Sequence, residues 1–355
     1  MYHCLLDEPK PSLSRFTGCL LGGALGDALG YPIEFLQTAA ILARHGTATP
    51  VALIREESGL AEVSDDTQMT LFTAEALIRD RQRQHTDARG DVLTAMQRAL
   101  QRWYRTQVPD WQPPEPSVLS GWLISVPGLH HRRAPGLTCL SALGGGERNT
   151  SKGCGAVMRV APIGLAAGDA AWAFEVASEA GALTHHHPSG YLSGAYLAAL
   201  IAGLVQAQPL PEAMAEAETL LRQAPGHEET LAAVRAAQHV AKAGPPDVVA
   251  IERLGGGWVG EEALAIALAC TLTADRSSPK GMADALWRAV AHSGDSDSTG
   301  AITGNLLGVM MGSEGLPEAW LADLELREVI ARVVQDLYTT TVLGESVDER
   351  DYPAG

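Results

Sequence analysis

Two short acidic segments contain the residues with the clearest potential for chemistry. Each places two carboxylates and neighbouring hydroxyls within four residues, as Ser64-Asp65-Asp66-Thr67 and Asp295-Ser296-Asp297-Ser298. Carboxylate and hydroxyl oxygens are the ligands that hard cations such as Mg²⁺ prefer, and Mn²⁺ at some sites. Helix capping by Ser, Thr or Asp explains one such residue in each segment. It does not explain the paired like charges, so the two segments together favour a metal site.

Two other motifs could contact a substrate. In Ser151-Lys152-Gly153-Cys154-Gly155, small residues expose backbone N–H groups that could hold an anion, and Lys152 could add positive charge. The spacing is not that of a Walker A motif. Three consecutive histidines begin at His185, but no clear set of further zinc ligands accompanies them. We therefore expect His185 to contact substrate, whereas Asp27 and Glu34 receive no role from the residues alone.

The bulk composition restricts the class of protein. With 355 residues, 46% of them hydrophobic, the chain can bury a large core. An aromatic content of only 5%, with many Ala and Gly residues, favours close-packed helices over a β-sandwich. A formal charge of -16 argues against a nucleic-acid partner.

The cysteines and the apolar runs bear on the compartment. The five cysteines show no Cys-x-x-Cys spacing, which fits a reducing cytosol. The N-terminus lacks the apolar run of a signal peptide, and the longest apolar stretch, about 195–205, is too short to span a bilayer. We therefore expect a cytoplasmic protein without a membrane partner.

Hydrophobic periodicity indicates the elements that position these motifs. Helices are expected over 16–29, from Ser64 onward and over 91–105, followed by an irregular Pro- and Trp-rich excursion over 107–152 that could face substrate. Later helices with short connectors are expected at 170–183, 189–206, 211–223, 228–242, 260–273, 281–292, 299–311 and 326–340. We predict one domain over 15–343, between a polar N-terminal tail, 1–14, and a frayed acidic C-terminal tail, 344–355.

Small residues spaced four apart predict how some of these helices pack. They form three ridges, at Gly22, Gly26 and Gly30, at Gly190, Gly194, Ala198 and Ala202, and at Gly300, Gly304 and Gly308. Such a ridge lets two helix axes approach closely. Because each helical Gly costs about 0.5–1 kcal/mol relative to Ala, three ridges indicate a packing or site requirement at those backbones.

Taken in order, these segments resemble the ADP-ribosylglycohydrolase family, which includes the dinitrogenase-reductase-activating glycohydrolases. The resemblance covers about residues 16–310, and its last motif, from Ser293 to Asn305, is quite specific. The matching pieces are Gly18–Gly30 with Glu34-Phe35, Ser64–Thr67, Gly155–Pro162, Thr184-His185 and Ser293–Ser298.

The resemblance implies an all-α fold, a compact orthogonal bundle of many helices, with a site for two Mg²⁺ or Mn²⁺ ions. The metal ligands it implies come from the two acidic helix starts: Ser64, Asp65 and Asp66, and Asp295, Asp297 and Ser298. The catalytic carboxylate that takes a proton from water would be Asp65, Asp66 or Glu34. The residues implied to bind the diphosphate and ribose are Ser151, Lys152, Gly153, Gly155 and His185.

The implied activity is metal-dependent hydrolysis of the N-glycosidic bond between ADP-ribose and an acceptor, with arginine on a protein as the leading acceptor. The partner would be an ADP-ribosylated protein or a small molecule that contains ADP-ribose. The Asp that the nitrogenase-regulating subgroup carries upstream of a Gly-x-Thr is Ala134 here, so the acceptor and the general base stay open. Two alternatives stay open: another binuclear-metal phosphoesterase that uses the same acidic clusters, and a non-catalytic immunity protein on this scaffold that binds an ADP-ribosylating toxin.

Overall fold

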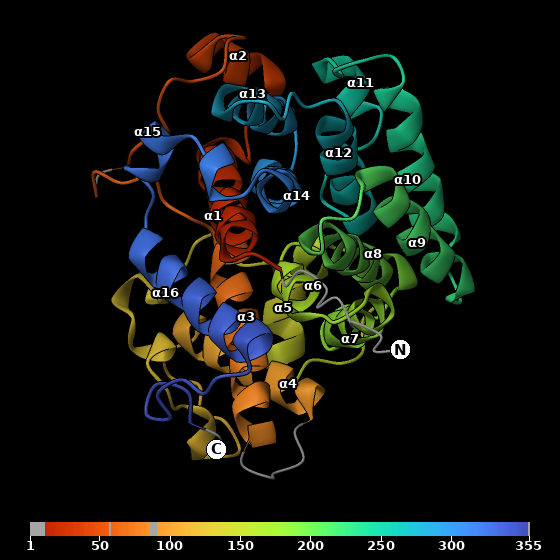
Figure 1. Cartoon of the computed structure of the whole chain (residues 1–355). Helices are drawn as coiled ribbons and strands as arrows, with labels where there is room; N and C mark the ends of the chain where they lie inside the picture. The colour runs from red at the N-terminus through yellow and green to blue at the C-terminus, as the bar shows by residue number, and fades with distance from the viewer. Residues whose placement is uncertain (1–10, 57, 86–90, 354–355) are drawn as a thin grey trace, which may run out of the picture.

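The chain folds as an assembly of α-helices without a β-sheet in the part that the structure describes. The computed structural model describes residues 11–56, 58–85 and 91–353; residues 1–10, most of the expected polar N-terminal tail, lie outside this part. Within it, extended pairing is confined to the isolated bridges Ala61–Leu324 and Gly153–Val259. The predicted all-α fold is therefore confirmed (Figure 1).

Most helices lie where hydrophobic periodicity placed them. The helices of the first half are α1 (Leu13–Gly30), α2 (Thr38–His45), α3 (Asp65–His85), α4 (Val92–Gln107), α5 (Leu137–Leu143), α6 (Ala161–Ala166), α7 (Ala170–Ala182) and α8 (Pro188–Val205). Those of the second half are α9 (Leu210–Gln223), α10 (Glu228–Ala241), α11 (Val248–Glu252), α12 (Gly260–Leu272), α13 (Pro279–Val290), α14 (Ser296–Met311), α15 (Glu318–Leu321) and α16 (Arg327–Tyr338). The predicted excursion is irregular up to residue 136 apart from short 3₁₀ turns, but it contains α5, which the pattern did not predict.

Helices α1 and α14 pack side by side at the centre of the bundle (Figure 1). A Cβ atom added to Gly26 would lie 2.0 Å from the carbonyl oxygen of Gly300, and one added to Gly304 would lie 1.9 Å from the carbonyl oxygen of Gly22. Backbone therefore touches backbone along two of the predicted ridges. This contact brings the start of α14 beside the C-terminal end of α1, where the acidic residues gather.

Gly304→Ala is expected to destabilise the fold strongly because the new methyl group meets a carbonyl oxygen that cannot move without shifting α1. Overpacking of a core costs about 1–3 kcal/mol, and we expect the upper end of that range. The measurement is the melting temperature by circular dichroism. Gly168→Ala is the matched control, since a Cβ there meets nothing within 4 Å. Equal melting temperatures for the two variants would contradict the importance of this contact.

Helix α8 is long and strongly apolar. By length and composition alone it could cross a membrane, because its 18 residues extend the apolar stretch at 195–205 in the N-terminal direction and keep a mean hydropathy of 1.3. In the fold, 89% of it is buried, and it packs against α6, α7, α9 and α12. The helix therefore serves as a core element.

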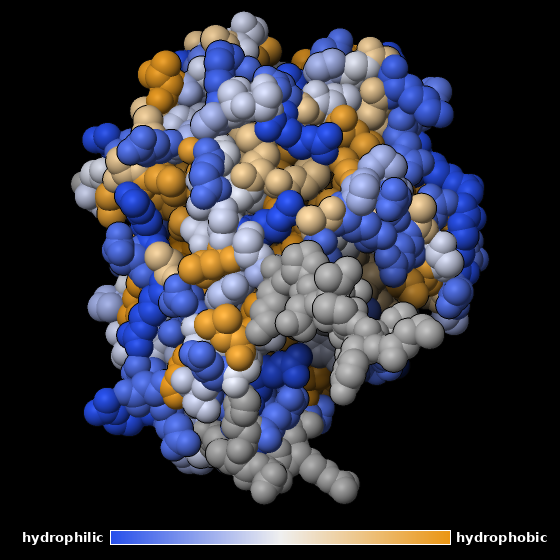
Figure 2. Space-filling view, viewed as in Figure 1, coloured by the Kyte–Doolittle hydropathy of each residue, from blue (hydrophilic) through white to orange (hydrophobic). Residues whose placement is uncertain are grey.

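On the face of the molecule seen in Figure 2, hydrophobic residues lie in scattered patches among hydrophilic ones.

The acidic C-terminal segment is largely exposed up to Arg350, but it is anchored to the bundle at Asp351 and Tyr352, so the expected fraying does not extend to these residues. The Tyr352 hydroxyl donates to Asp336 Oδ2 at 2.7 Å, and Arg332 pairs with Asp351. The Arg332 guanidinium also stacks 4.0 Å from the ring centroid of Trp122. Because these partners lie on α16 and on the irregular segment, the sequence of the tail alone did not reveal them.

Candidate active site

The two acidic turns meet at one cavity of about 520 Å³. The first turn of α3 brings Asp65 and Asp66, and the start of α14 brings Asp295 and Asp297. Glu34, which follows the 3₁₀ turn at Tyr31–Ile33, completes the carboxylates of the lining. All five are buried, with 2–6% of their surface exposed. The other lining residues are Phe35, Ala134–Cys139, Gly153–Gly155, Met158, His185, Trp258 and Ser298.

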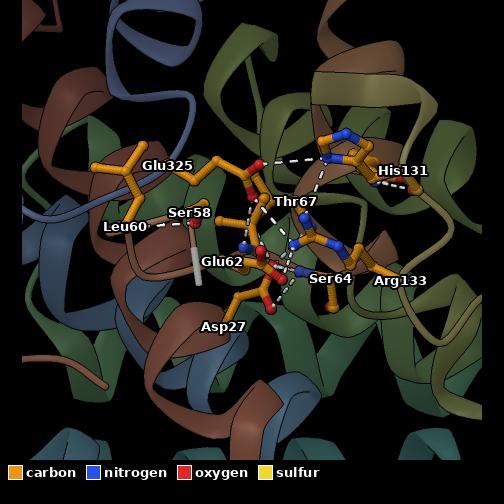
Figure 3. A network of polar contacts seen from close by, with 11 residues as sticks. Asp27, Ser58, Leu60, Glu62, Ser64, Thr67, His131, Arg133 and Glu325 are labelled. Carbon is orange, nitrogen blue, oxygen red and sulfur yellow. Dashed lines mark hydrogen bonds and ion pairs between the residues drawn. The ribbon is translucent and has the colours of Figure 1, made fainter. Parts of the chain in front are cut away.

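The first turn of α3 is held by a carboxylate from another helix. Asp27, on α1, accepts hydrogen bonds from the backbone N–H of Ser64 at 3.0 Å and of Thr67 at 3.1 Å, and from the Thr67 hydroxyl at 2.5 Å (Figure 3). The Ser64 hydroxyl accepts from the N–H of Asp66 at 3.2 Å. The unpaired N–H groups of the helix start are thereby satisfied without the cavity-lining carboxylates.

The start of α14 is held differently. Asp295 Oδ1 accepts from the Ser298 N–H at 3.3 Å, as a helix cap does, and its other oxygen accepts from the Cys154 thiol at 2.8 Å. The turn before it approaches a neighbouring loop so closely that a Cβ on Gly294 would lie 2.0 Å from the carbonyl oxygen of Gly256. Only glycine fits there, and the contact sets the direction in which α14 begins.

The carboxylates of the cavity repel one another in a buried setting. Burial, then the charges of Asp297, Asp65 and Asp27, raise the pKa of Glu34 to about 9. Burial raises the pKa of Asp295 to about 6. The pKa values of Asp65, Asp66 and Asp297 are raised well above the usual range, first by burial and then by neighbouring carboxylates. Such a cluster is stabilised by protons or by cations.

The oxygen atoms of the cluster fit a hard divalent cation. Glu34 Oε2 and Asp66 Oδ2 are buried without a hydrogen-bond partner, and no lysine or arginine is among the described residues that line the cavity. Among the described residues, no three or more His, Cys, Asp or Glu side chains are arranged closely enough to coordinate a metal ion as they stand. The donor set therefore matches Mg²⁺ or Mn²⁺ in chemistry, whereas the convergence of its atoms on an ion remains a prediction.

His185 faces the cavity beside the glycine-rich loop. Burial, then the charge of Arg159, lower the pKa of its imidazole to about 3, so the ring is neutral near pH 7. Its Nδ1 atom is 2.9 Å from the Thr184 hydroxyl. A Cβ on Gly153 would lie 3.2 Å from Nε2 of His185, and one on Gly155 would lie 3.0 Å from its Cε1. The glycines thus let the loop close on a histidine that can hydrogen-bond a neutral group such as a sugar hydroxyl.

Three residues that the sequence assigned to the site do not line the cavity. The Lys152 ammonium group pairs with Glu229 and lies 3.6 Å from Glu261, at the starts of α10 and α12, so it is engaged outside the cavity lining and its role toward substrate stays a prediction. The Ser151 hydroxyl bonds to Thr138 and accepts from the Gly153 N–H, and Ser64 is fully buried, with its hydroxyl bonded to the Asp66 N–H. Ser151 and Ser64 support the walls of the cavity without lining it.

In the glycine-rich loop, two of the backbone N–H groups are already hydrogen-bonded within the protein. The Gly153 N–H donates to Ser151 Oγ at 3.1 Å, and the Cys154 N–H donates to the carbonyl oxygen of Trp258 at 3.3 Å. These two N–H groups, which were expected to bind an anion, are therefore not free to do so. The pairing of the loop with residue 258, more than one hundred positions away, was invisible in the local pattern.

Sequence reasoning missed an aromatic pair that lines the cavity. Phe35 and Trp258 are 72% and 46% exposed, and their rings stack with centroids 5.8 Å apart and planes at 21°. It also missed which part of the irregular excursion reaches the site: residues 134–139 line the cavity, and the Gly136 N–H donates to Asp65 Oδ2 at 3.2 Å. A signal for the pair was present, since Phe35 directly follows Glu34 in the motif.

Comparison with known proteins decides the family. The model of the ADP-ribosylglycohydrolase family matches residues 8–346, nearly the whole chain. The chain belongs to the ADP-ribosylglycohydrolase family. This glycohydrolase is 27% identical over 328 residues to an uncharacterised protein of Archaeoglobus fulgidus, covering 91% of the chain and 96% of that protein. It is 24% identical over 353 residues to the ADP-ribosylarginine hydrolase Tri1 of Pseudomonas putida, covering 97% and 82%.

A solved structure supports the fold. The glycohydrolase superposes on a chain described as an ADP-ribosylglycohydrolase-related protein complex with a TM-score of 0.63 at 24% identity, covering 93% of this chain and 98% of that one. Membership of the family identifies the protein as a hydrolase of ADP-ribosyl-acceptor linkages, with an ADP-ribosylated substrate as its partner.

Proposed function

We propose that this glycohydrolase uses Mg²⁺ or Mn²⁺ to hydrolyse the N-glycosidic bond of ADP-ribosylarginine on a protein. The observation that carries the proposal is the gathering of five buried carboxylates from three distant segments around one cavity that no described lysine or arginine lines. Such a concentration of buried carboxylates is stabilised when cations bind among them. Arginine as the acceptor is supported by the name of the Pseudomonas putida relative.

The residues that would hold the cations are those whose oxygens line the cavity. Asp65 and Asp66 would contribute from α3, and Asp295, Asp297 and Ser298 from α14, with Glu34 beside them. Divalent cations, when bound, supply Lewis acidity and lower the pKa of water. Ser64 is left out of this set, because its hydroxyl caps the helix and does not line the cavity.

The chain's own groups have separable tasks in this scheme. Asp65, Asp66 or Glu34 takes the proton of the attacking water, and the remaining carboxylates favour the positive charge that develops on the sugar. Neutral His185 holds a ribose hydroxyl through Nε2, the ring nitrogen that faces the glycine-rich loop. The buried Arg159 links that loop to the histidine, since it donates to the Gly155 carbonyl at 2.8 Å and to the Thr184 hydroxyl at 2.9 Å.

The direct test is incubation of an arginine-ADP-ribosylated protein with the glycohydrolase in Mg²⁺, in Mn²⁺ and in EDTA. We expect release of intact ADP-ribose in either metal and almost none in EDTA. A serine-linked substrate run in parallel reports the acceptor. Release of AMP with the ribose phosphate left on the protein would instead identify a phosphoesterase, and undiminished activity in EDTA would contradict the role of cations.

Trp258→Ala is expected to raise KM for an ADP-ribosylated peptide about tenfold with little change in kcat. The exposed stack of Phe35 and Trp258 offers a flat surface for the nucleobase of the substrate, and stacking of a base on an aromatic ring contributes about 1–3 kcal/mol. Since the base is remote from the bond that breaks, ground state and transition state lose the same interaction. Trp258→Phe keeps a ring and is the control. An unchanged KM in Trp258→Ala would contradict this role.

A further inference from the structure

We propose that Asp27 is a positioning residue for cation binding: it sets the first turn of α3 and adds negative charge behind the cavity without contributing an oxygen to its lining. This inference rests on the proposed cation site. Asp27 is 0% exposed and lies on α1, whereas the residues that it holds lie 37 and 40 positions later in the chain.

Every polar contact of the Asp27 carboxylate is with a donor. The Ser64 N–H donates to both carboxylate oxygens, and Oδ2 also accepts from the N–H and the hydroxyl of Thr67. These donors belong to the start of α3, where the helix dipole favours a negative charge. No proton is needed on Asp27 to make these bonds, so the geometry matches the ionised form.

The consequence concerns the two residues between Ser64 and Thr67. With the donors on both sides tied to Asp27, the turn that carries Asp65 and Asp66 has a defined orientation, and both side chains line the cavity. The other side of this turn is held by the loop at Arg133, whose carbonyl oxygen accepts from the Asp65 N–H at 3.2 Å and whose guanidinium pairs with Glu62 at 2.5 Å (Figure 3). Of these two supports, the Asp27 carboxylate can carry a negative charge, whereas the Arg133 carbonyl oxygen is neutral.

The charge of Asp27 reaches the lining carboxylates through space. Asp27 is fully buried and is hydrogen-bonded to the residues on both sides of Asp65 and Asp66, so little solvent screens its charge from the cavity. A buried negative charge attracts a cation placed near it, and a divalent cation more strongly than a monovalent one. Removal of the charge should therefore weaken cation binding although every oxygen of the lining stays in place.

The test compares Mn²⁺ affinity by isothermal titration calorimetry for the parent, Asp27→Asn and Thr67→Val. Asp27→Asn keeps the size of the side chain but removes its charge, and we expect a loss of about 10–100-fold, the usual effect of outer partners of a metal site. Thr67→Val keeps the charge and removes one hydrogen-bond donor, so we expect a smaller loss of about two- to tenfold. Saturating Mn²⁺ should restore most of kcat in both variants, which a merely structural defect would not allow.

The outcomes separate this inference from the proposed function. A parent protein that binds neither Mn²⁺ nor Mg²⁺ contradicts the cation site itself, and the inference with it. A parent that binds Mn²⁺ while folded Asp27→Asn binds it equally well contradicts only the role of Asp27. If Asp27→Asn does not fold by circular dichroism, Thr67→Val decides, and an unchanged affinity in that variant overturns the inference.

Discussion

Asp297→Ala is expected to lower kcat for an ADP-ribosylated substrate by at least about 10²–10³-fold and to weaken Mn²⁺ binding by more than about 100-fold. Asp297 is 3% exposed at the start of α14 and lines the cavity beside the carboxylates of α3. The substitution removes an oxygen donor and a negative charge together. The measurements are release of ADP-ribose and calorimetric titration with Mn²⁺.

Two further variants isolate the cause of that loss. Asp297→Asn keeps an oxygen but not the charge, and we expect it to fall between the parent and the alanine variant. Asp284→Ala removes a carboxylate on α13 that pairs with Lys280 outside this cavity, and it should leave both measurements close to those of the parent. A kcat and a Mn²⁺ affinity in Asp297→Ala equal to those of the parent would contradict the proposed mechanism.

The thermal stability of the cation-free protein is expected to fall as pH rises from about 5 to 9. The folded-state pKa is raised to about 9 for Glu34 and to about 6 for Asp295, against ordinary values of 4.5 and 3.8. A carboxyl group whose pKa is higher in the folded state stabilises the fold while it is protonated, and this contribution is lost as pH rises through the folded-state value. The measurement is the melting temperature in EDTA at several pH values.

Divalent cations should remove most of this dependence, because they and protons compete for the same oxygens. At a hundredfold excess over Kd, ligand binding stabilises a protein by about 2.7 kcal/mol, which corresponds to roughly 4 °C for a chain of this size. We expect that rise with Mg²⁺ at pH 8 and a much smaller one at pH 5. Titrating groups elsewhere in the protein affect the melting temperature equally in both conditions. The difference between the melting temperatures in Mg²⁺ and in EDTA therefore reports on the carboxylates of the cavity. A difference that does not grow with pH would contradict the electrostatic account.

Much of the secondary structure could be predicted because it depends on near neighbours in the chain. The apolar period along 189–206 and the glycines of 299–311 correspond closely to α8 and α14. The same local patterns identified both acidic helix starts, since two adjacent carboxylates with hydroxyls exceed what a single cap needs. The short helix α5 was missed because its seven residues carry too little periodicity to distinguish it from a loop.

The partners of individual side chains could not be predicted in the same way. Lys152 was expected to face substrate, yet the fold brings Glu229 and Glu261 to it from two later helices. The acidic C-terminal segment was expected to be frayed, yet Tyr352 reaches Asp336 on α16. In both cases the deciding contact joins distant positions, and charge composition alone does not say which opposite charge will be nearest.

By itself, the sequence determined that this protein is a bundle of helices, that two of its helices begin with paired carboxylates, and that glycines allow close helix contacts. These properties are local, because backbone hydrogen bonds and side-chain spacing within a few residues set them. Only the tertiary structure decided that the two acidic turns share one cavity, that Asp27 supports one of them from α1, and that Trp258 stacks on Phe35. The physical reason is that the backbone contact of Gly26 with Gly300 fixes the relative placement of α1 and α14, and a contact 274 positions apart is created only when the core packs.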